Sequence, residues 1–137
     1  MIITDAKESK NIDNLISKKY KIPSNIRMEV AGLEAFKLIN SYFKPKRALI
    51  IIGTGNNGGD GLVLARYMFI NNISCDIFMM ENSKKTSVDF KNNKKIVEKL
   101  NISFVKSLNK NKISKYDLIV DAIFGIGLNR DIQIKSP

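Results

Sequence analysis

Two glycine-containing segments carry the residues best suited to chemistry in this chain of 137 residues. The first reads GTGNNGGDG over residues 53–61, and the second begins at Asp121 and continues to residue 131. Each follows an uninterrupted apolar run, which is typical of a buried strand, so both are expected just beyond the carboxyl end of a strand. The candidate binding residues are Asn56, Asn57, Gly58, Gly59 and Asp60 in the first segment and Gly125, Ile126, Gly127, Leu128, Asn129, Arg130 and Asp131 in the second.

The first segment contains the pattern G-x-G-x-x-G at residues 53–58, between a predicted strand and a predicted helix. Glycines permit positive φ and close backbone approach, so amides at the start of the helix could converge on an anion. Glu81 lies near the end of the next strand, where a ribose-binding acid would sit. The Asp60 carboxylate would repel a phosphate at that point, so it is expected to bind a ribose hydroxyl, an amide or a cation. The alternative is a plain glycine turn with Asp60 as the helix cap.

The second segment offers a carboxylate, flexible glycines and a basic side chain. Asp121 ends an apolar run, and we expect its carboxylate to point into a cleft above the sheet. A buried carboxylate needs a partner, which a cation, loop amides or a substrate group could supply. Arg130 is a candidate phosphate contact, with a surface salt bridge as the alternative.

The apolar periodicity predicts the elements that would position these segments. Two N-terminal helices are separated by a break at Pro23, and the second, which ends by Pro45, presents Met28, Ala31, Gly32, Ala35 and Ile39 on one face. Strands are predicted at 47–52, 75–80, 102–105 and 118–123, the first and last buried on both faces, with helices at 62–70 and 87–100 and a polar connection at 106–115. The last helix is expected to bury Val88, Ile96, Val97 and Leu100. This order predicts an α/β fold with a Rossmann-like, doubly wound, mostly parallel sheet.

Composition narrows the classes of function. With 44% hydrophobic and 26% charged residues, the chain is expected to form one globular domain over 1–137. Its apolar runs are too short to span a membrane, and its N-terminus lacks a secretory signal, so the cytoplasm is expected. One cysteine and no histidine exclude an internal disulfide, Cys/His zinc sites and histidine-activated nucleophiles.

The net charge of +10 predicts little about partners. Nineteen of the 23 basic residues are lysine, beside 15 asparagines and 21 isoleucines, a composition expected of an AT-rich genome. Arginine, which reads bases and phosphates through two parallel hydrogen bonds, occurs only four times. We therefore interpret the charge as a solvated lysine surface, with neither nucleic acid nor membrane as partner.

Several stretches together resemble the NAD(P)H-hydrate epimerases, the YjeF N-terminal domain family. The segment 53–61 is similar to the family's signature loop, and 117–128, DLIVDAIFGIGL, is similar to its second glycine loop. The stretches YKIP at 20–23 and MEVAG at 28–32 resemble the family's N-terminal helices. Lys21, where the family commonly has glycine, and Val30, where it often has a polar residue, are departures that helices or turns should tolerate.

The resemblance implies an isomerase that interconverts the R and S forms of the C6 hydrates of NADH and NADPH, NADHX and NADPHX. It implies that residues 56–60 and 125–131 contact the hydrate and that Asn57 and Asp121 help to hold a potassium ion. It leaves the catalytic residue unassigned and a homodimer open. The alternatives are a non-catalytic Rossmann-like binding or scaffold module, and an NAD(P)-binding oxidoreductase fragment that uses residues 53–58 as a dinucleotide fingerprint.

The family's domain continues beyond the second glycine loop, with further strands and an Asp-x-Pro-Ser-Gly type segment that supplies another potassium ligand. The chain is therefore expected to be the N-terminal portion of such a domain, with a fold incomplete at the C-terminus. A sheet that stops after four strands exposes an edge and apolar surface, which predicts association.

Overall fold

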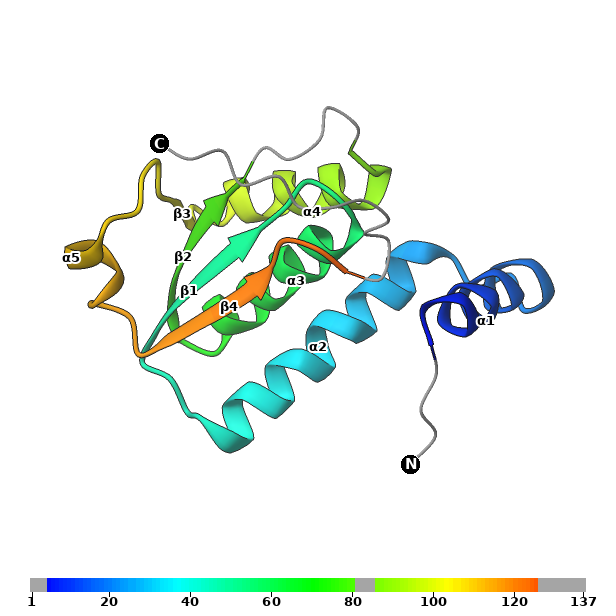
Figure 1. Ribbon diagram of the computed structural model, residues 1–137, viewed down its shortest axis with the longest axis horizontal. Helices are drawn as coiled ribbons and strands as arrows, with labels where there is room; N and C mark the ends of the chain where they lie inside the picture. The colour runs from blue at the N-terminus through cyan, green and yellow to red at the C-terminus, as the bar shows by residue number, and fades with distance from the viewer. Residues whose placement is uncertain (1–4, 81–85, 126–137) are drawn as a thin grey trace.

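The computed structural model describes residues 5–80 and 86–125 as an α/β domain around one parallel sheet (Figure 1). Its elements are α1 (Ala6–Lys19), α2 (Ser24–Tyr42), β1 (Arg47–Ile52), α3 (Asn56–Ile70), β2 (Ser74–Met79), α4 (Val88–Lys99), β3 (Ser103–Phe104), α5 (Lys110–Ile113) and β4 (Leu118–Ala122). The predicted element order is confirmed, apart from the short α5 within the polar connection. The predicted bounds of β1 are confirmed, and those of the other strands differ by one residue at one or both ends.

The strands lie in the order β3-β2-β1-β4, and every pair is parallel. The chain moves outward from β1 to β3 and then returns to place β4 on the other side of β1. This order is doubly wound, as predicted, and its switch point lies between β1 and β4. Both glycine segments begin at the carboxyl ends of these two strands.

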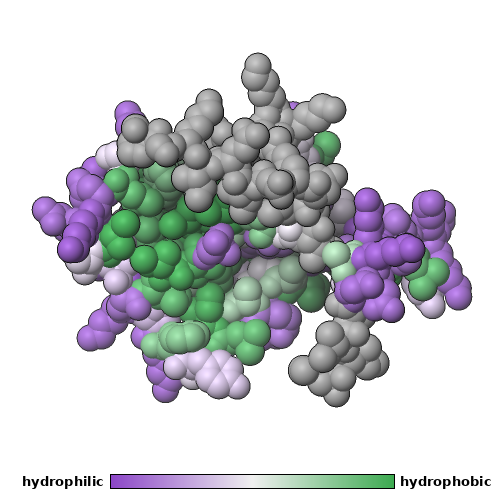
Figure 2. All heavy atoms as spheres, viewed as in Figure 1, coloured by the Kyte–Doolittle hydropathy of each residue, from purple (hydrophilic) through white to green (hydrophobic). Residues whose placement is uncertain are grey.

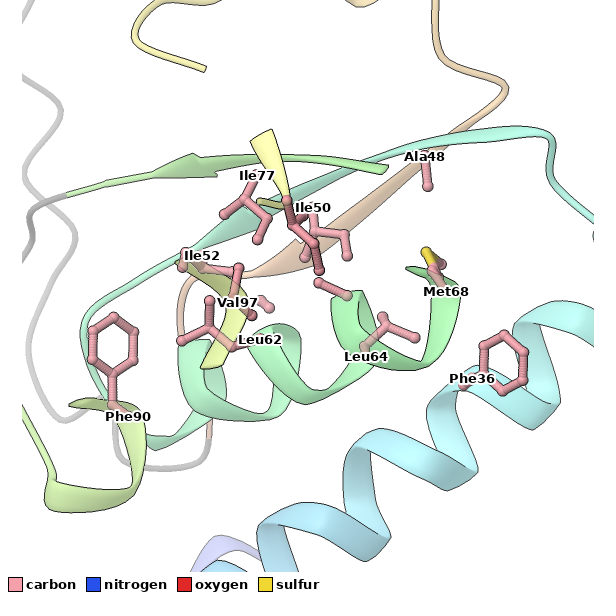
Figure 3. Close-up of a cluster of buried hydrophobic side chains, with 13 residues drawn as sticks. Phe36, Ala48, Ile50, Ile52, Leu62, Leu64, Met68, Ile77, Phe90 and Val97 are labelled. Carbon is pink, nitrogen blue, oxygen red and sulfur yellow. The ribbon is translucent and has the colours of Figure 1, made fainter. Parts of the chain in front are cut away.

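The hydrophobic core lies between the sheet and the helices α2, α3 and α4, which cover one face (Figures 1 and 3). Alternate residues of β1, Ala48, Ile50 and Ile52, meet Leu62 and Met68 of α3 in this core, and all five are fully buried. The twofold alternation of a strand thus selects which residues of β1 face the helices.

The opposite face of the sheet is partly open. Burial alternates along β4, where Ile119 is 47% exposed and Asp121 is also exposed. Figure 2 shows apolar surface on the face turned to the viewer, where Figure 1 places the strands in front of α3. The prediction that residues 118–123 are buried on both faces is wrong, because within the described residues β4 pairs only with β1 and the long helices pack on one side. For β1 the same prediction holds at Leu49, which is fully buried on that face, whereas Ile51 is half-buried.

The inner face of α2 differs slightly from the predicted one. Met28, Gly32 and Phe36 are its buried residues, at intervals of four, whereas Ala31 is exposed. The period of 3.6 places residues four apart on one face, and the packing against α3 selects the row that contains Phe36.

The inner face of α4 also differs from the predicted one. Its buried residues are Phe90, Asn93 and Val97, while Val88 is 71% and Ile96 42% exposed. The residues at 90, 93 and 97 follow helical spacing, but a polar residue at the central position concealed the pattern in the sequence.

Helix α1 lies outside the core. Its N-terminus has a capping box formed by Asp5 and Glu8, and none of its residues is buried. It is followed by Lys21 at φ 56°, the left-handed position after the helix where glycine is commonest. Arg27 of α2 connects the two helices, since it donates to Ser17 Oγ and its Nε lies 3.6 Å from Asp13 Oδ1.

Among residues 5–80 and 86–125, no helix is both long and apolar enough to cross a membrane. The half-buried Cys75 thiol lies 3.6 Å from the Ala65 carbonyl, and burial raises its pKa to about 11. Cys75 is therefore a thiol at neutral pH, and a thiolate nucleophile is not expected.

Candidate functional site

The first glycine segment is a tight connection between β1 and α3. Gly53 N donates to Ala122 O at 3.1 Å, which joins the end of β1 to the end of β4. Gly55 caps α3, and Gly59 N closes the first helical turn on Gly55 O at 3.1 Å. Helix α3 therefore begins at Asn56, and the prediction that it begins at Leu62 is wrong.

The glycines of this segment serve close packing. A Cβ on Gly58 would lie 2.0 Å from Gly53 O, and one on Gly61 would lie 2.9 Å from both Ala122 Cβ and Ile52 Cγ2. No glycine in the described part of the chain has positive φ, so the glycines' tolerance of positive φ is not used there. The missing side chains instead allow the first turns of α3 to lie directly on the ends of β1 and β4. For this reason the helix can contain Gly58, Gly59 and Gly61.

Asn57 joins the first glycine segment to the second. Its Nδ2 donates to Phe124 O at 3.0 Å, and a Cβ on Gly125 would lie 3.3 Å from Asn57 Cβ. Because Nδ2 donates to a carbonyl, the atom of this side chain that could accept from a ligand or bind a cation is the amide oxygen Oδ1. The structure therefore brings together Asn57 and Gly125, which are 68 positions apart in sequence.

Asp121 lies on β4, three residues before Phe124, and its exposure differs from the predicted burial. It is exposed, and its Oδ1 accepts from Ile123 N at 2.9 Å. The expectation of a buried carboxylate is wrong because Asp121 is on the open face of the sheet, beside the half-buried Ile51 in the β1–β4 register. An exposed carboxylate can still bind a cation, with a smaller desolvation penalty.

Asp60 lies on α3 one turn after Asn57, on the same side of the helix. It does not cap the helix, since Gly55 is the N-cap residue. Burial of the half-exposed carboxyl, together with the nearby charge of Asp13, raises the pKa of Asp60 to about 6. Asp60 therefore exchanges its proton much closer to neutral pH than an ordinary aspartate.

Replacing Asp60 with asparagine should stabilise the fold at neutral pH. The folded-state pKa is raised, so wild-type stability is greatest below the ordinary value of about 3.9 and falls as the pH rises through about 6. After allowance for solvent screening, Asp60→Asn should gain about 1 kcal/mol at pH 7 and nothing below about pH 4. Urea unfolding at several pH values measures this, with Glu98→Gln, which removes an exposed ion pair with Lys94, as the control. An equal gain at both pH extremes would contradict the predicted titration.

The backbone at the start of α3 also suits an anion. The amides of residues 56–58 precede Gly59 N, the first amide with an intrahelical acceptor, and they carry the positive end of the helix dipole. The switch point thus has amide donors and the Asn57 side chain at the start of α3, with the Asp60 carboxylate one turn along that helix and the Asp121 carboxylate on the open face of the sheet.

The remaining predicted residues have mixed outcomes. Asn56 is exposed, Gly58 and Gly59 are buried, and Gly125 is exposed. Glu81, Ile126, Gly127, Leu128, Asn129, Arg130 and Asp131 lie outside the described residues. Within residues 5–80 and 86–125, no cluster of three or more acidic or cysteine side chains suits a metal ion.

Two supporting residues were not identified as such from the sequence. Met28 is buried under the first turn of α3, where a Cβ on Gly59 would lie 2.5 Å from Met28 Cε. Asn93 of α4 donates to Met28 Sδ at 3.4 Å and to Asp89 O at 3.0 Å. Only a methionine four residues before a helical glycine hints at this packing, and that signal is too weak to find it.

A parallel sheet in this strand order, with two glycine segments in contact at its switch point, defines a Rossmann-like α/β domain. A family model described as "YjeF-related protein N-terminus" matches residues 24–136. The chain belongs to this family, which confirms the resemblance seen in the sequence.

Named relatives agree with this membership. The chain is 35% identical over 133 residues to an NAD(P)H-hydrate epimerase of Oenococcus oeni, an alignment that covers 96% of the chain and 62% of that protein. It is 34% identical over 138 residues to a bifunctional NAD(P)H-hydrate repair enzyme, Nnr, of Moorella thermoacetica, with coverage of 93% and 26%. The chain thus spans less than two thirds of the length of the first relative and about a quarter of the second.

A crystal structure of the yeast protein ynu0 has the same fold. It superposes with a TM-score of 0.80 at 24% sequence identity, and the match covers 97% of this chain and 60% of the yeast chain. This likeness supports the Rossmann-like α/β assignment.

Proposed function

We propose that this domain acts in the epimerisation of NAD(P)H hydrates, with NADHX and NADPHX as substrates. The observation that carries the proposal is the hydrogen bond from Asn57 to Phe124 O, because it joins the family's two glycine segments into one site. Relatives that are 35% and 36% identical to the chain over the aligned residues are named NAD(P)H-hydrate epimerases. The proposed hydrate contacts are residues 56–60 and 125–131.

The described residues suit both the phosphates and the nicotinamide ring of such a substrate. The amides at the start of α3 can bind a phosphate, and the carboxylates of Asp60 and Asp121 can stabilise positive charge. In the proposed reaction the C6–O bond breaks, and the hydroxide takes up a proton to leave as water. Water then adds to the other face of the iminium-like ring and returns the proton. Asp60 and Asp121 supply the negative charge that favours this ring.

A potassium ion is part of the proposal, with Asn57 and Asp121 as ligands. Both offer oxygen donors, which hard cations prefer, and Asn57 Oδ1 is available because Nδ2 binds Phe124 O. The bound ion would supply positive charge for the substrate's phosphates. A homodimer is also proposed, and the exposed apolar surface over the open face of the sheet supports it (Figure 2).

Incubation with the R form of NADPHX, followed by chromatography for the S form, tests the function. We expect conversion by the wild type. Asn57→Ala should lower kcat/KM by about 100-fold, because it removes both the hydrogen bond to Phe124 O and a proposed cation ligand. Asn40→Ala, at an exposed position on α2, should match the wild type. A wild type that leaves the R form unchanged contradicts the activity of this chain.

The two alternatives give different results in the same preparation. A scaffold module would neither bind the hydrate nor respond to potassium. An NAD(P)-dependent oxidoreductase would bind intact NAD tightly at one molecule per chain. The continuation of the first segment through Gly59, Asp60 and Gly61, beyond the dinucleotide fingerprint, counts against the latter.

A further inference from the structure

Helices α2 and α3 run side by side and in register under the sheet (Figures 1 and 3). Three contacts follow one another at intervals of four residues in both helices. Met28 lies against Gly59, Gly32 against Val63, where a Cβ would lie 2.4 Å from Val63 Cγ1, and Phe36 stacks on Tyr67 with ring centroids 6.0 Å apart. In the first two a glycine faces a larger side chain, so an axial slip would produce clashes.

A polar clamp formed by Glu29, Arg66 and Tyr67 stabilises this register of the two helices. Glu29 of α2 accepts from Arg66 Nη2 and, at 2.8 Å, from Tyr67 Oη, both on α3. The Arg66 side chain is only 14% exposed, and within the described residues its Nε is buried without an acceptor. Glu29 is therefore the acidic partner that compensates a largely buried guanidinium.

The clamp and the candidate site are connected through Met28. Met28 is adjacent to Glu29, is 5% exposed, and fills the space that a side chain on Gly59 would need. Gly59 lies between Asn57, which contacts the second glycine segment, and Asp60. A shift of α2 along α3 would thus be transmitted to the first turn of α3.

We propose that Glu29 is a positioning residue for the site. By binding Arg66 and Tyr67 it fixes α2 along α3, so that Met28 supports Gly59 and the turn of residues 56–60 keeps its place against β4. The substrate part of this inference rests on the proposed function, whereas the positioning of the turn does not. Misplacement of binding groups by a fraction of an ångström weakens substrate binding before it unfolds the protein.

Two variants and one control test the inference. Glu29→Gln removes the charge of the clamp, and Tyr67→Phe removes one hydrogen bond while keeping the ring and the Arg66 contact. Glu34→Gln is the matched control, since Glu34 is on the same helix but forms only an exposed pair with Lys37 at 2.7 Å. Hydrogen exchange of the peptide covering 56–61 and steady-state kinetics with the R form of NADPHX are measured on the full chain.

We expect exchange of the 56–61 amides to rise about 5-fold or more in both variants, with β1 and β2 unchanged and the control like the wild type. KM should rise by a similar factor with kcat within about 2-fold, because a displaced turn weakens binding. Unchanged exchange at 56–61, or a rise spread over the whole domain, overturns the positioning role. A local rise with unchanged KM overturns the link to the substrate. A wild type that does not bind the hydrate contradicts the proposed function, while exchange still decides the role of Glu29.

Discussion

Gly58→Ala should destabilise the domain by about 3 kcal/mol or more, at the upper end of the effects of overpacking. The added Cβ would lie 2.0 Å from Gly53 O and 2.8 Å from Gly53 C. Both are backbone atoms, and Gly53 is itself held by its hydrogen bond to Ala122 O. Neither can rotate away as a side chain could, so α3 must move off the ends of β1 and β4.

Gly55→Ala is the matched control for this prediction. No atom lies within 4 Å of a Cβ built there, so the only expected effect is the weaker capping of α3 by alanine, about 1 kcal/mol or less. Urea unfolding followed by circular dichroism measures both variants. Equal stability of the two would show that the close approach at Gly58 is not needed for the fold.

Asp76→Asn should cost about 2 kcal/mol at neutral pH, because it removes the buried charge at the centre of a partly exposed cluster. Asp76 on β2 is 8% exposed, and its Oδ2 accepts from Arg47 Nη2 and Tyr116 Oη, both at 2.8 Å. The Arg47 guanidinium also lies over the Tyr116 ring, 5.3 Å from its centroid. One carboxylate thus links β2 to β1 and to the residues that lead into β4.

The loss of stability caused by Asp76→Asn should become smaller as the pH falls. Burial by itself raises the pKa of Asp76, but hydrogen bonds from Arg47, Tyr116 and Ser103 and the charge of Arg47 lower it below its ordinary value. A lowered folded-state pKa gives stability that is present above about pH 4 and is lost as the pH falls through the folded value. The wild type and Asp76→Asn should therefore converge in stability at acidic pH.

A double-mutant cycle with Tyr116→Phe checks that the cluster acts as a unit. The two substitutions together should cost less than the sum of their single effects, since they remove a shared hydrogen bond. Tyr20→Phe, at a side chain that is 58% exposed, should be neutral. Strict additivity of Asp76→Asn and Tyr116→Phe would contradict a direct coupling.

Much of the fold could be predicted from local pattern. Continuous apolar residues from Ala48 to Ile52 predicted a strand buried on both faces, and glycines after both β1 and β4 indicated where the site would form. The same reasoning failed for β4, where the apolar run looks alike but alternate residues are exposed. An edge position and the number of covered faces depend on the rest of the fold, and no local pattern contains them.

The sequence by itself determined the class of fold, the family, and the two segments that form the candidate site, because these depend on residue type and spacing along the chain. Tertiary structure alone decided what the glycines do. From the sequence, either positive φ or close backbone approach could explain them, with the helix expected from Leu62; in the fold they let α3 begin at Asn56 and lie directly on the strand ends.

The tertiary structure also decided the states of the two carboxylates. Asp60 is half-buried with a raised pKa, and Asp121 is exposed although its position after an apolar run suggested a buried carboxylate. Burial and pairing depend on neighbours that are far away in the chain, such as Asp13 for Asp60, and Glu29 depends in the same way on Arg66 and Tyr67. Such neighbours come together only when the helices and strands pack.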